Sequence, residues 1–379
     1  MKFKRNAIFN ILISSFLSLF IVSVLAIYLI RDITKTANEE QFKLMKTIVE
    51  FNLSGSEDKA IARAEIIACI PKIKELFAQQ NREELLNECK TIFEIQRDKY
   101  GVEQAQFHLA PATSFLRLNA PEKFGDDLST FRPMVVAVNK DKTLRKGVAL
   151  ARSGPAIFGV VPVSDSLGNH IGSFEIGLNF GSMLDKLKAA YGLESAVFID
   201  TEMLKKICTS LSGDYFNEKN EVGKYLKYHS TNWDLVQNLV KDSDFSNLEE
   251  EKIPYERIAL DNDYGVVIVP LRNAAGVTFG AIVVGKNFDD IKSLQNRSIL
   301  TIVFISIFAF IFLTGVVFFI IGGGLVRPLN VLVENFKTLT NNNSEPANID
   351  NSKLYCELKE LAEQYEILKN KMNESENKN

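Results

Sequence analysis

Two long segments without a charged side chain constrain the fold of this sequence more than any other feature. They cover residues 6–30 and residues 298–326. An α-helix rises about 1.5 Å per residue, so about 23 helical residues cross roughly 34 Å, which is enough for a hydrocarbon core of about 30 Å. Helices in soluble cores rarely run so far without a charge. The sequence therefore predicts transmembrane helices at residues 8–30 and 298–321.

A cleaved signal peptide is the alternative reading of the first segment. Its apolar core would have roughly 7–15 residues and would end in small side chains. The run here continues through residues 27–30 (IYLI), which favours an uncleaved anchor. Lys2, Lys4 and Arg5 precede it without an acidic residue, and this bias places the N-terminus in the cytoplasm. Two crossings then put residues 31–297 outside and the tail inside.

The outer segment is long enough for two domains. Its cysteines are Cys69, Cys89 and Cys208, an odd and sparse set that makes no disulfide framework. A bridge between Cys69 and Cys89 is the alternative, and free thiols are the favoured state. Hydrophobic cores must therefore hold this segment together.

The first part of the outer segment has helical periodicity. Apolar residues recur at helical spacings over residues 31–70, with Gly55 as a weak point and no proline before Pro71. About forty helical residues would extend roughly 60 Å. Such a stalk would carry a first domain beyond a second one nearer the membrane. A further helical stretch is predicted at Lys72–Tyr100.

The period then changes to that of strands and short helices. A turn rich in Asp, Ser, Gly and Asn joins two of the strands across residues 164–169. Helices are predicted at Phe131–Asn139 and Met183–Tyr191. The predicted strands are Gln104–Leu109, Thr113–Leu118, Phe158–Val163, Ile171–Leu178, Ser195–Asp200, Arg257–Leu260, Gly265–Pro270 and Thr278–Lys286.

A thirteen-residue pattern occurs twice. GNHIGSFEIGLNF (residues 168–180) and GVTFGAIVVGKNF (residues 276–288) share glycines and a final Asn-Phe at the same offsets. Each copy ends a strand and precedes a helical segment, which indicates a duplicated α+β module. Gly168 and Gly276 are predicted to lie in turns at positive φ, which glycine adopts without strain.

The tail after the second apolar segment predicts two heptad helices. Pro328 suits a helix start, and Leu329, Leu332, Phe336 and Leu339 follow at 3-4-3 spacing. Residues 358, 361, 365, 368 and 372 form a second seam beyond a polar connector. Short heptad helices need a partner chain to bury their seams, most simply as a four-helix bundle in a homodimer. An amphipathic tail on lipid is the alternative, but the polar faces mix Glu and Lys.

The tail resembles a HAMP domain, because Pro328-Leu329 and Glu357-Leu358 match the landmarks of its two helices. Thr340 and Asn341 stand where a glycine is often found. The outer segment resembles a double Cache sensor domain of the chemotaxis-receptor and sensor-kinase type. Residues 106–140 (QFHLAPATSFLRLNAPEKFGDDLSTFRPMVVAVNK) and 158–180 (FGVVPVSDSLGNHIGSFEIGLNF) carry this resemblance.

The resemblance implies an α+β fold in which a long stalk helix and two tandem PAS-like modules lie outside a bacterial cytoplasmic membrane. It also implies a homodimer and a last transmembrane helix that carries the signal inward, with both termini cytoplasmic. The expected organisation is cytoplasmic N-terminus 1–7, transmembrane helix 8–30, stalk and distal helices 31–100, membrane-distal module 101–190, membrane-proximal module 191–297, transmembrane helix 298–321, HAMP-like hairpin 322–375 and tail 376–379.

The ligand-binding candidates lie in the membrane-distal module. A guanidinium offers paired hydrogen bonds to a carboxylate, so a small anionic ligand is predicted. An internal salt bridge with Asp126, Asp127 or Glu175 is the alternative role for each arginine, and a structural role is the alternative for the histidine. The candidates are His108, Phe115, Arg117, Arg132, Arg152, Phe158 and Glu175.

The sequence also departs from the family pattern. Ala149 and Ala151 stand where Glu and Gly are common, and Phe158 stands where Arg is common. Losing charged groups favours a less polar ligand, or a pocket that no longer binds the usual one.

No enzyme, cofactor or metal site is predicted. The sequence has no phosphate-binding glycine loop and no Cys/His metal spacing. Its basic residues do not cluster, which argues against nucleic-acid binding. The predicted function is a transmembrane sensory receptor for a small ligand, without an output domain, that could contact another receptor or kinase through its cytoplasmic helices. The alternatives are a membrane-anchored binding or scaffold protein, and the truncated input half of a sensor kinase or diguanylate cyclase.

Overall fold

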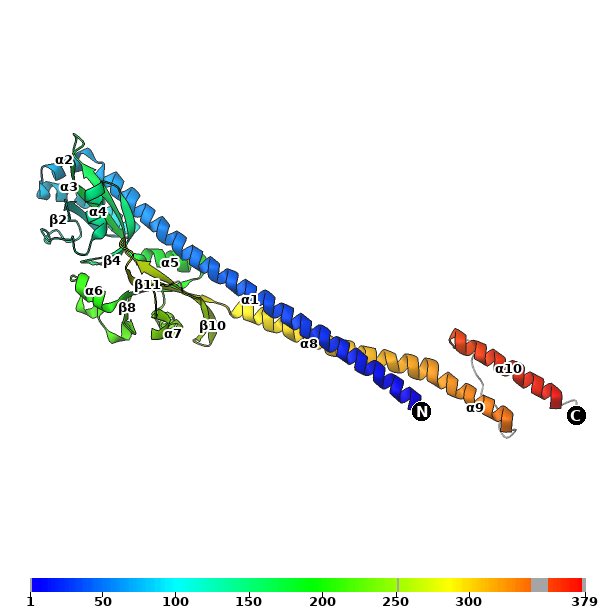
Figure 1. Cartoon of the computed structure of the whole chain (residues 1–379). Coiled ribbons are helices and arrows are strands. Elements are labelled where there is room, and N and C mark those ends of the chain that lie inside the picture. The colour runs from blue at the N-terminus through cyan, green and yellow to red at the C-terminus, as the bar shows by residue number, and fades with distance from the viewer. Residues whose placement is uncertain (1, 251, 342–353, 377–379) are drawn as a thin grey trace. The chain divides into compact units, whose positions relative to one another are not determined.

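The computed structural model describes residues 2–250, 252–341 and 354–376 of the chain (Figure 1). The chain divides into two compact units: Thr36–Asp290, and Met1–Lys35 together with Ile291–Asn379. The fold is mixed α+β, with a long N-terminal helix, a strand-rich part and a C-terminal helix, as predicted.

Helix α1, Lys2–Ala68, contains both the first apolar segment and the predicted stalk. Gly55 does not interrupt it. The helix ends close to Pro71, and Ile70 just before that proline is extended, with ψ at 121°. A proline ring disfavours helical geometry in the residue that precedes it, so the sequence itself marks where α1 ends.

The prediction of one helical stretch at Lys72–Tyr100 is wrong. The structure has two helices there, α2 (Pro71–Ala78) and α3 (Arg82–Tyr100). The side chain of Asn81 accepts a hydrogen bond from the backbone N–H of Glu84 at 3.3 Å. Asparagine is among the strongest N-cap residues, and it starts a new helix here.

The first β-sheet has the strand order β2-β1-β5-β4-β3, with all neighbours antiparallel. Helices α1 and α2 pack on one face. The rings of Phe77 in α2 and Phe107 lie 5.1 Å apart, and a Cβ added at Gly159 would lie 2.3 Å from the backbone nitrogen of Ile61 in α1. Helix α4 (Pro133–Asp141) covers the other face. The strands are β1 (Val102–Leu109), β2 (Thr113–Arg117), β3 (Arg145–Ala151), β4 (Gly154–Ser164) and β5 (His170–Leu178).

The second β-sheet has the order β7-β8-β6-β11-β10-β9. Strand β6 of this sheet corresponds to β1 of the first, and β8, β9, β10 and β11 correspond to β2, β3, β4 and β5. With this correspondence, the run β8-β6-β11-β10-β9 has the same order as the first sheet. Helix α1 packs here too, since the rings of Phe42 and Phe288 lie 5.4 Å apart. The strands are β6 (Glu194–Asp200), β7 (Glu221–Val222), β8 (Tyr225–Ser230), β9 (Tyr255–Ala259), β10 (Asn262–Arg272) and β11 (Thr278–Asn287).

Short helices complete this unit. Helix α5 (Phe180–Tyr191) connects the two sheets in the chain, and α7 (Trp233–Leu239) packs on the core of the second sheet. Figure 1 shows α2, α3 and α4 around the first sheet, and α6 and α7 beside the second. The remaining helical elements are α6 (Thr201–Ile207) and the 3₁₀ turns η1 (Gly213–Tyr215), η2 (Glu218–Asn220) and η3 (Asp242–Phe245).

The repeated pattern forms the last hairpin of each sheet. The prediction of positive φ is confirmed, with φ at 86° for Gly168 and 80° for Gly276. Three residues earlier, the side chain of Asp165 accepts hydrogen bonds from two backbone N–H groups of its turn. Asn273 does the same in the other copy. Both turns therefore combine an Asp or Asn cap with a glycine in the left-handed region.

The final Asn-Phe of the pattern begins the next helix. The side chain of Asn179 accepts from the N–H of Ser182 at 2.8 Å, and that of Asn287 accepts from the N–H of Asp289 at 2.7 Å. The phenylalanines that follow, Phe180 and Phe288, are fully buried. In each copy, the pattern therefore starts a helix directly after the strand that comes last in the chain order of its sheet.

The other unit contains apolar helices. The helical stretches Asn6–Ala68 and Asp289–Thr338 are each long and apolar enough to cross a membrane, and their most apolar windows are 0% buried. Within this unit, the hydroxyls of Ser23 and Ser306 lie 2.6 Å apart. Helix α8 (Asp289–Val317) continues into a π-helix, η4 (Phe318–Val326), which contains the three consecutive glycines.

The tail contains α9 (Arg327–Asn341) and α10 (Cys356–Glu376). Leu332, Leu358 and Ala362 form a small core, and the rings of Phe336 and Tyr365 meet edge to face at 5.2 Å. Other seam positions are exposed, namely Leu329, Leu361, Leu368 and Met372. The predicted polar connector lies almost entirely outside the described residues, as does the side chain of Leu339.

Candidate functional site

The face of the first sheet beneath α4 carries buried polar side chains. Residues directly opposite in an antiparallel ladder share a face. Gln106 in β1 pairs with Arg117 in β2 and with Glu175 in β5, and Glu175 pairs in turn with Val160 in β4. Val160 packs in the same cluster as α4. One row of the sheet therefore brings an amide, a guanidinium and a carboxylate to this face.

Arg132 approaches the row from the helix side. It is the N-cap of α4 and is followed by Pro133 at the first helical position. Its Nη2 donates to the carboxylate of Glu175, and the two side chains are 2% and 1% exposed. The guanidinium carbon also lies 4.3 Å from the centre of the Phe158 ring. The pair joins α4 to the middle of the sheet.

The ionisation of Glu175 follows from these neighbours. Complete burial raises the pKa of the carboxyl, but Arg132 and His108 outweigh burial and hold the pKa below its usual value. Glu175 is therefore charged at neutral pH. Arg132 supplies its counter-charge.

His108 in β1 stands next to this pair. Its Nδ1 lies 3.2 Å from the Ser173 hydroxyl. Its Nε2 lies 3.6 Å from Glu175 Oε1, which is too long for a hydrogen bond. In the described part of the chain, His108 Nε2 and Arg132 Nε are buried without a hydrogen-bond partner. Such groups are rare in folded proteins.

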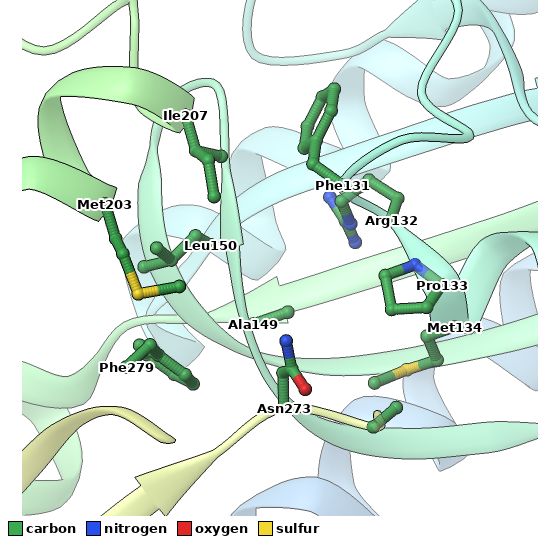
Figure 2. A pocket seen from close by; sticks show the side chains of 11 residues that line it. Phe131, Arg132, Pro133, Met134, Ala149, Leu150, Met203, Ile207, Asn273 and Phe279 are labelled. Atoms are coloured by element: carbon green, nitrogen blue, oxygen red, sulfur yellow. The ribbon is translucent and has the colours of Figure 1, made fainter. Parts of the chain in front are cut away.

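A small cavity lies beside Arg132. Its volume is about 20 Å³, which is room for about one water molecule. Figure 2 shows that side chains from distant parts of the chain surround it. Its walls are apolar except for Arg132 and Asn273. The lining residues are Phe131, Arg132, Pro133, Met134, Ala149, Leu150, Met203, Ile207, Asn273, Ala274 and Phe279.

Arg117 and Arg152 lie in a different place. Arg117 donates to Asp126 at 2.9 Å and to the carbonyl of Lys123 at 2.8 Å, and Arg152 Nε lies 3.8 Å from Asp126. Partial burial raises the pKa of Asp126, but Arg117 and, more weakly, Arg152 hold it below its usual value. These groups line an open cleft of about 510 Å³ together with Ser210 and other polar residues.

The structure thus separates the predicted site residues. His108, Arg132, Phe158 and Glu175 come together beneath α4, while Arg117 and Arg152 line the open cleft. Two of the arginines form the internal salt bridges that were the alternative to ligand binding. Arg117 pairs with Asp126, and Arg132 pairs with Glu175.

Phe115 joins neither group. Its ring lies 5.4 Å from that of Phe77 in α2, on the opposite face of the sheet. The ladder pairs His108 with Ser114 and Phe107 with Leu116, which leaves Phe115 as the extra residue of a β-bulge. Simple alternation along β2 could not reveal this displacement.

The sequence analysis missed the cavity residues from the second half of the chain. Met203 and Ile207 come from α6, Asn273 from the turn between β10 and β11, and Phe279 from β11. No local pattern singles them out, because each is an ordinary residue of its own element. Ala149, which departs from the family pattern, does line the cavity, and its small side chain leaves part of the space open.

A comparison with models of protein families identifies the family of the chain. The family model dCache_3, the double sensory domain of two-component sensor kinases, matches residues 40–230, just over half of the 379 residues. The chain belongs to this double Cache family. The matched region contains the whole first sheet together with β6, β7 and β8 of the second. The resemblance of the outer segment to a double Cache sensor domain is therefore confirmed.

Solved double Cache structures are similar to this chain at low sequence identity. The ligand-binding domain of the Campylobacter jejuni chemoreceptor Tlp3, in complex with 4-methylisoleucine, is 13% identical with a TM-score of 0.41, covering 69% of this chain and 94% of that one. The sensor domain of the Vibrio cholerae histidine kinase DctB is 10% identical with a TM-score of 0.40, covering 67% and 98%. The periplasmic domain of Vibrio cholerae LuxQ is 9% identical with a TM-score of 0.37, covering 66% and 99%. No curated protein matches the sequence.

Proposed function

We propose that this double Cache protein is a non-enzymatic transmembrane receptor that binds a small ligand beneath α4 and passes a conformational signal through the second apolar helix. The observation that carries the proposal is the buried Arg132–Glu175 pair, whose arginine lines a cavity. Arg132 Nε and His108 Nε2 have no hydrogen-bond partner among the described residues. A small molecule that forms hydrogen bonds with these buried groups would remove the free-energy cost of leaving them unpaired.

The charges of the site restrict the ligand. Glu175 already neutralises Arg132, so a simple carboxylate would have to displace Glu175 and leave it buried without a counter-charge. A zwitterion avoids this problem, because its carboxylate can meet Arg132 while its ammonium meets Glu175. The apolar wall from Phe131, Met203 and Phe279 favours an apolar body. We therefore infer an amino-acid-like ligand in place of a plain organic acid.

Binding requires the site to open. Ligand pockets usually enclose about 300 Å³ or more, whereas this cavity accommodates about one water molecule. The first turn of α4 would have to move away from β3 and α6. Ligand would then stabilise the open arrangement by its difference in affinity between the two states.

A connected set of elements could transmit this movement. Asn273 and Phe279 belong to the β10–β11 hairpin and line the cavity. Strand β11 ends at Asn287, whose side chain caps the start of α8, and Asp289 also accepts from the N–H of Asp263 at 2.8 Å. A displacement of the hairpin would therefore be transmitted through the backbone and through these hydrogen bonds to α8, which continues into the second apolar segment.

The remaining parts of the proposal concern topology and assembly. Two candidate spans flank the sensory domain, and this arrangement fits a protein of the bacterial inner membrane. We infer that residues 31–297 are extracytoplasmic and that both termini are cytoplasmic, from the basic residues before the first span. The exposed seam of α10 supports a HAMP-like homodimer, or contact with another receptor or kinase.

A non-signalling, membrane-anchored scaffold is the second candidate function. The closed cavity favours it, because a first module that never opens would bind no small molecule. Thermal unfolding of the full-length protein in lipid nanodiscs, screened against free amino acids and small organic acids, separates the two. The receptor predicts that at least one zwitterion raises the unfolding temperature, and that Arg132→Leu abolishes the shift while the surface variant Arg145→Leu retains it. Binding by no compound favours the scaffold.

A further inference from the structure

A second cleft is lined by residues of both modules. It has about 610 Å³ and shares no residue with the cavity beside Arg132. One wall is the first half of α5 together with Glu103 of β1. The opposite wall comes from η1 and β8 of the second sheet. Neither the function proposed above nor the family comparison assigns it a role.

The wall from the second sheet is aromatic. The rings of Tyr215 and Tyr228 stack with centroids 5.8 Å apart and planes 17° from parallel. The imidazole of His229 continues this wall and lies against Gly181 of α5, where an added Cβ would be 2.8 Å from the ring. Burial, and then the nearby charge of Glu103, raises the pKa of Tyr228, so its phenol stays neutral. Aromatic surface of this kind attracts cations.

The facing wall carries an excess of negative charge. Glu103 and Asp185 contribute carboxylates, and Lys186 is the one cation among the cleft residues. Adjacent residues on a helix do not face each other, so Lys186 is poorly placed to neutralise Asp185. The described structure contains no ion pair for Asp185. A bound cation would gain attraction from both walls, whereas an anion would meet two carboxylates.

We propose that this cleft is a second binding site, and that it takes a small organic cation such as a quaternary ammonium compound. The aromatic wall would contact the apolar surface of the cation, and Asp185 and Glu103 would supply the counter-charge. This proposal is independent of the ligand beneath α4, because Arg132 and Glu175 take no part in it.

The site also touches the first sheet. A Cβ added at Gly154, where β4 begins, would lie 2.7 Å from the Tyr228 hydroxyl. In the same region the N–H of Ser210 donates to the carbonyl of Arg152 at 3.0 Å. An occupant that fixes Tyr228 would therefore also restrain the β3–β4 turn, and with it the contact between the two modules.

The test is isothermal titration of the full-length protein in nanodiscs with choline and with its uncharged isostere, 3,3-dimethyl-1-butanol. Choline is expected to bind at least about fivefold more tightly than the isostere, given the size of cation–π and carboxylate attraction at a partly exposed site. Equal affinity for the two compounds, or no binding of choline, would overturn the proposal.

Variants provide the residue-level test. Asp185→Asn, an exposed position with no structural partner among the described residues, should weaken choline binding about threefold or more, and Tyr228→Leu should abolish it. Lys186→Met should strengthen binding, an outcome that a structural role would not produce. The control Tyr191→Leu, on the same helix but outside the cleft, should leave choline binding unchanged. If Tyr191→Leu weakens choline binding as much as Tyr228→Leu does, the cleft is not the site.

Discussion

Arg132 at the start of α4 donates a hydrogen bond to Glu175 in the middle of β5, and both side chains are almost completely buried. This contact ties a helix to the sheet that it covers. Arg132 also lines the small cavity, to which both modules contribute residues.

Removal of one partner should strongly destabilise the sensory domain. Arg132→Met or Glu175→Met alone leaves a buried charge without compensation, and each is expected to cost about 3–5 kcal/mol. The double variant should cost less than either single change, since no charge then remains. Unfolding followed by circular dichroism in nanodiscs measures these costs. Arg145→Met, which removes an exposed ion pair with Asp141, is the control and should cost about 0–1 kcal/mol.

The same pair predicts a dependence on pH. The pKa of Glu175 is lower in the folded state than its ordinary value. Its stabilising contribution is therefore complete above the unfolded pKa of about 4.3, and it is lost as the pH falls through the lower folded value. The difference in unfolding temperature between wild type and Glu175→Gln should be largest near pH 7 and should shrink on acidification toward pH 3. The exposed Glu202→Gln variant should differ little from wild type at any pH. A difference that grows in acid would contradict the assignment of Glu175 as a charged group.

Substitution by alanine should change stability in opposite directions at two glycines, one that packs against α1 and one that lies within it. At Gly159, an added Cβ would lie 2.3 Å from the backbone of Ile61 in α1, so Gly159→Ala must separate the helix from the sheet and should cost several kcal/mol, on the order of an overpacked core. At Gly55, within α1, an added Cβ meets nothing within 4 Å. Gly55→Ala should therefore stabilise the helix by about 0.5–1 kcal/mol. Comparable destabilisation by both variants in thermal unfolding would show that α1 does not pack as described.

Local patterns predicted the parts of this fold that local chemistry determines. Apolar runs identified β4, β5 and β11, and the repeated glycines identified the turns at Gly168 and Gly276. Strands β3, β7 and β8 were missed. Strand β3 begins with Arg145 and Lys146, and β8 reads YLKYHS, so neither has the apolar run that marked the other strands.

The candidate site was predicted only in part, for a related reason. Arg132 and Glu175 attract attention as charged residues in apolar surroundings, and they do meet. Met203 and Asn273 line the same cavity, but they reach it through the packing of one module on the other. That packing depends on contacts between residues far apart in the chain. The spacing of residues within either segment therefore cannot predict it.

The central claim is that a ligand beneath α4 changes the arrangement of the tail. Its most direct test is the rate of disulfide crosslinking between two copies of a full-length Leu361→Cys variant, at an exposed position of α10, in a background where the native cysteines are replaced by serine. The measurement uses nanodiscs with and without a zwitterion that raises the unfolding temperature. We expect the ligand to change the crosslinking rate in this protein and to leave it unchanged when Arg132→Leu is added. A rate that stays the same at saturating ligand, in a protein that demonstrably binds it, would contradict the claim.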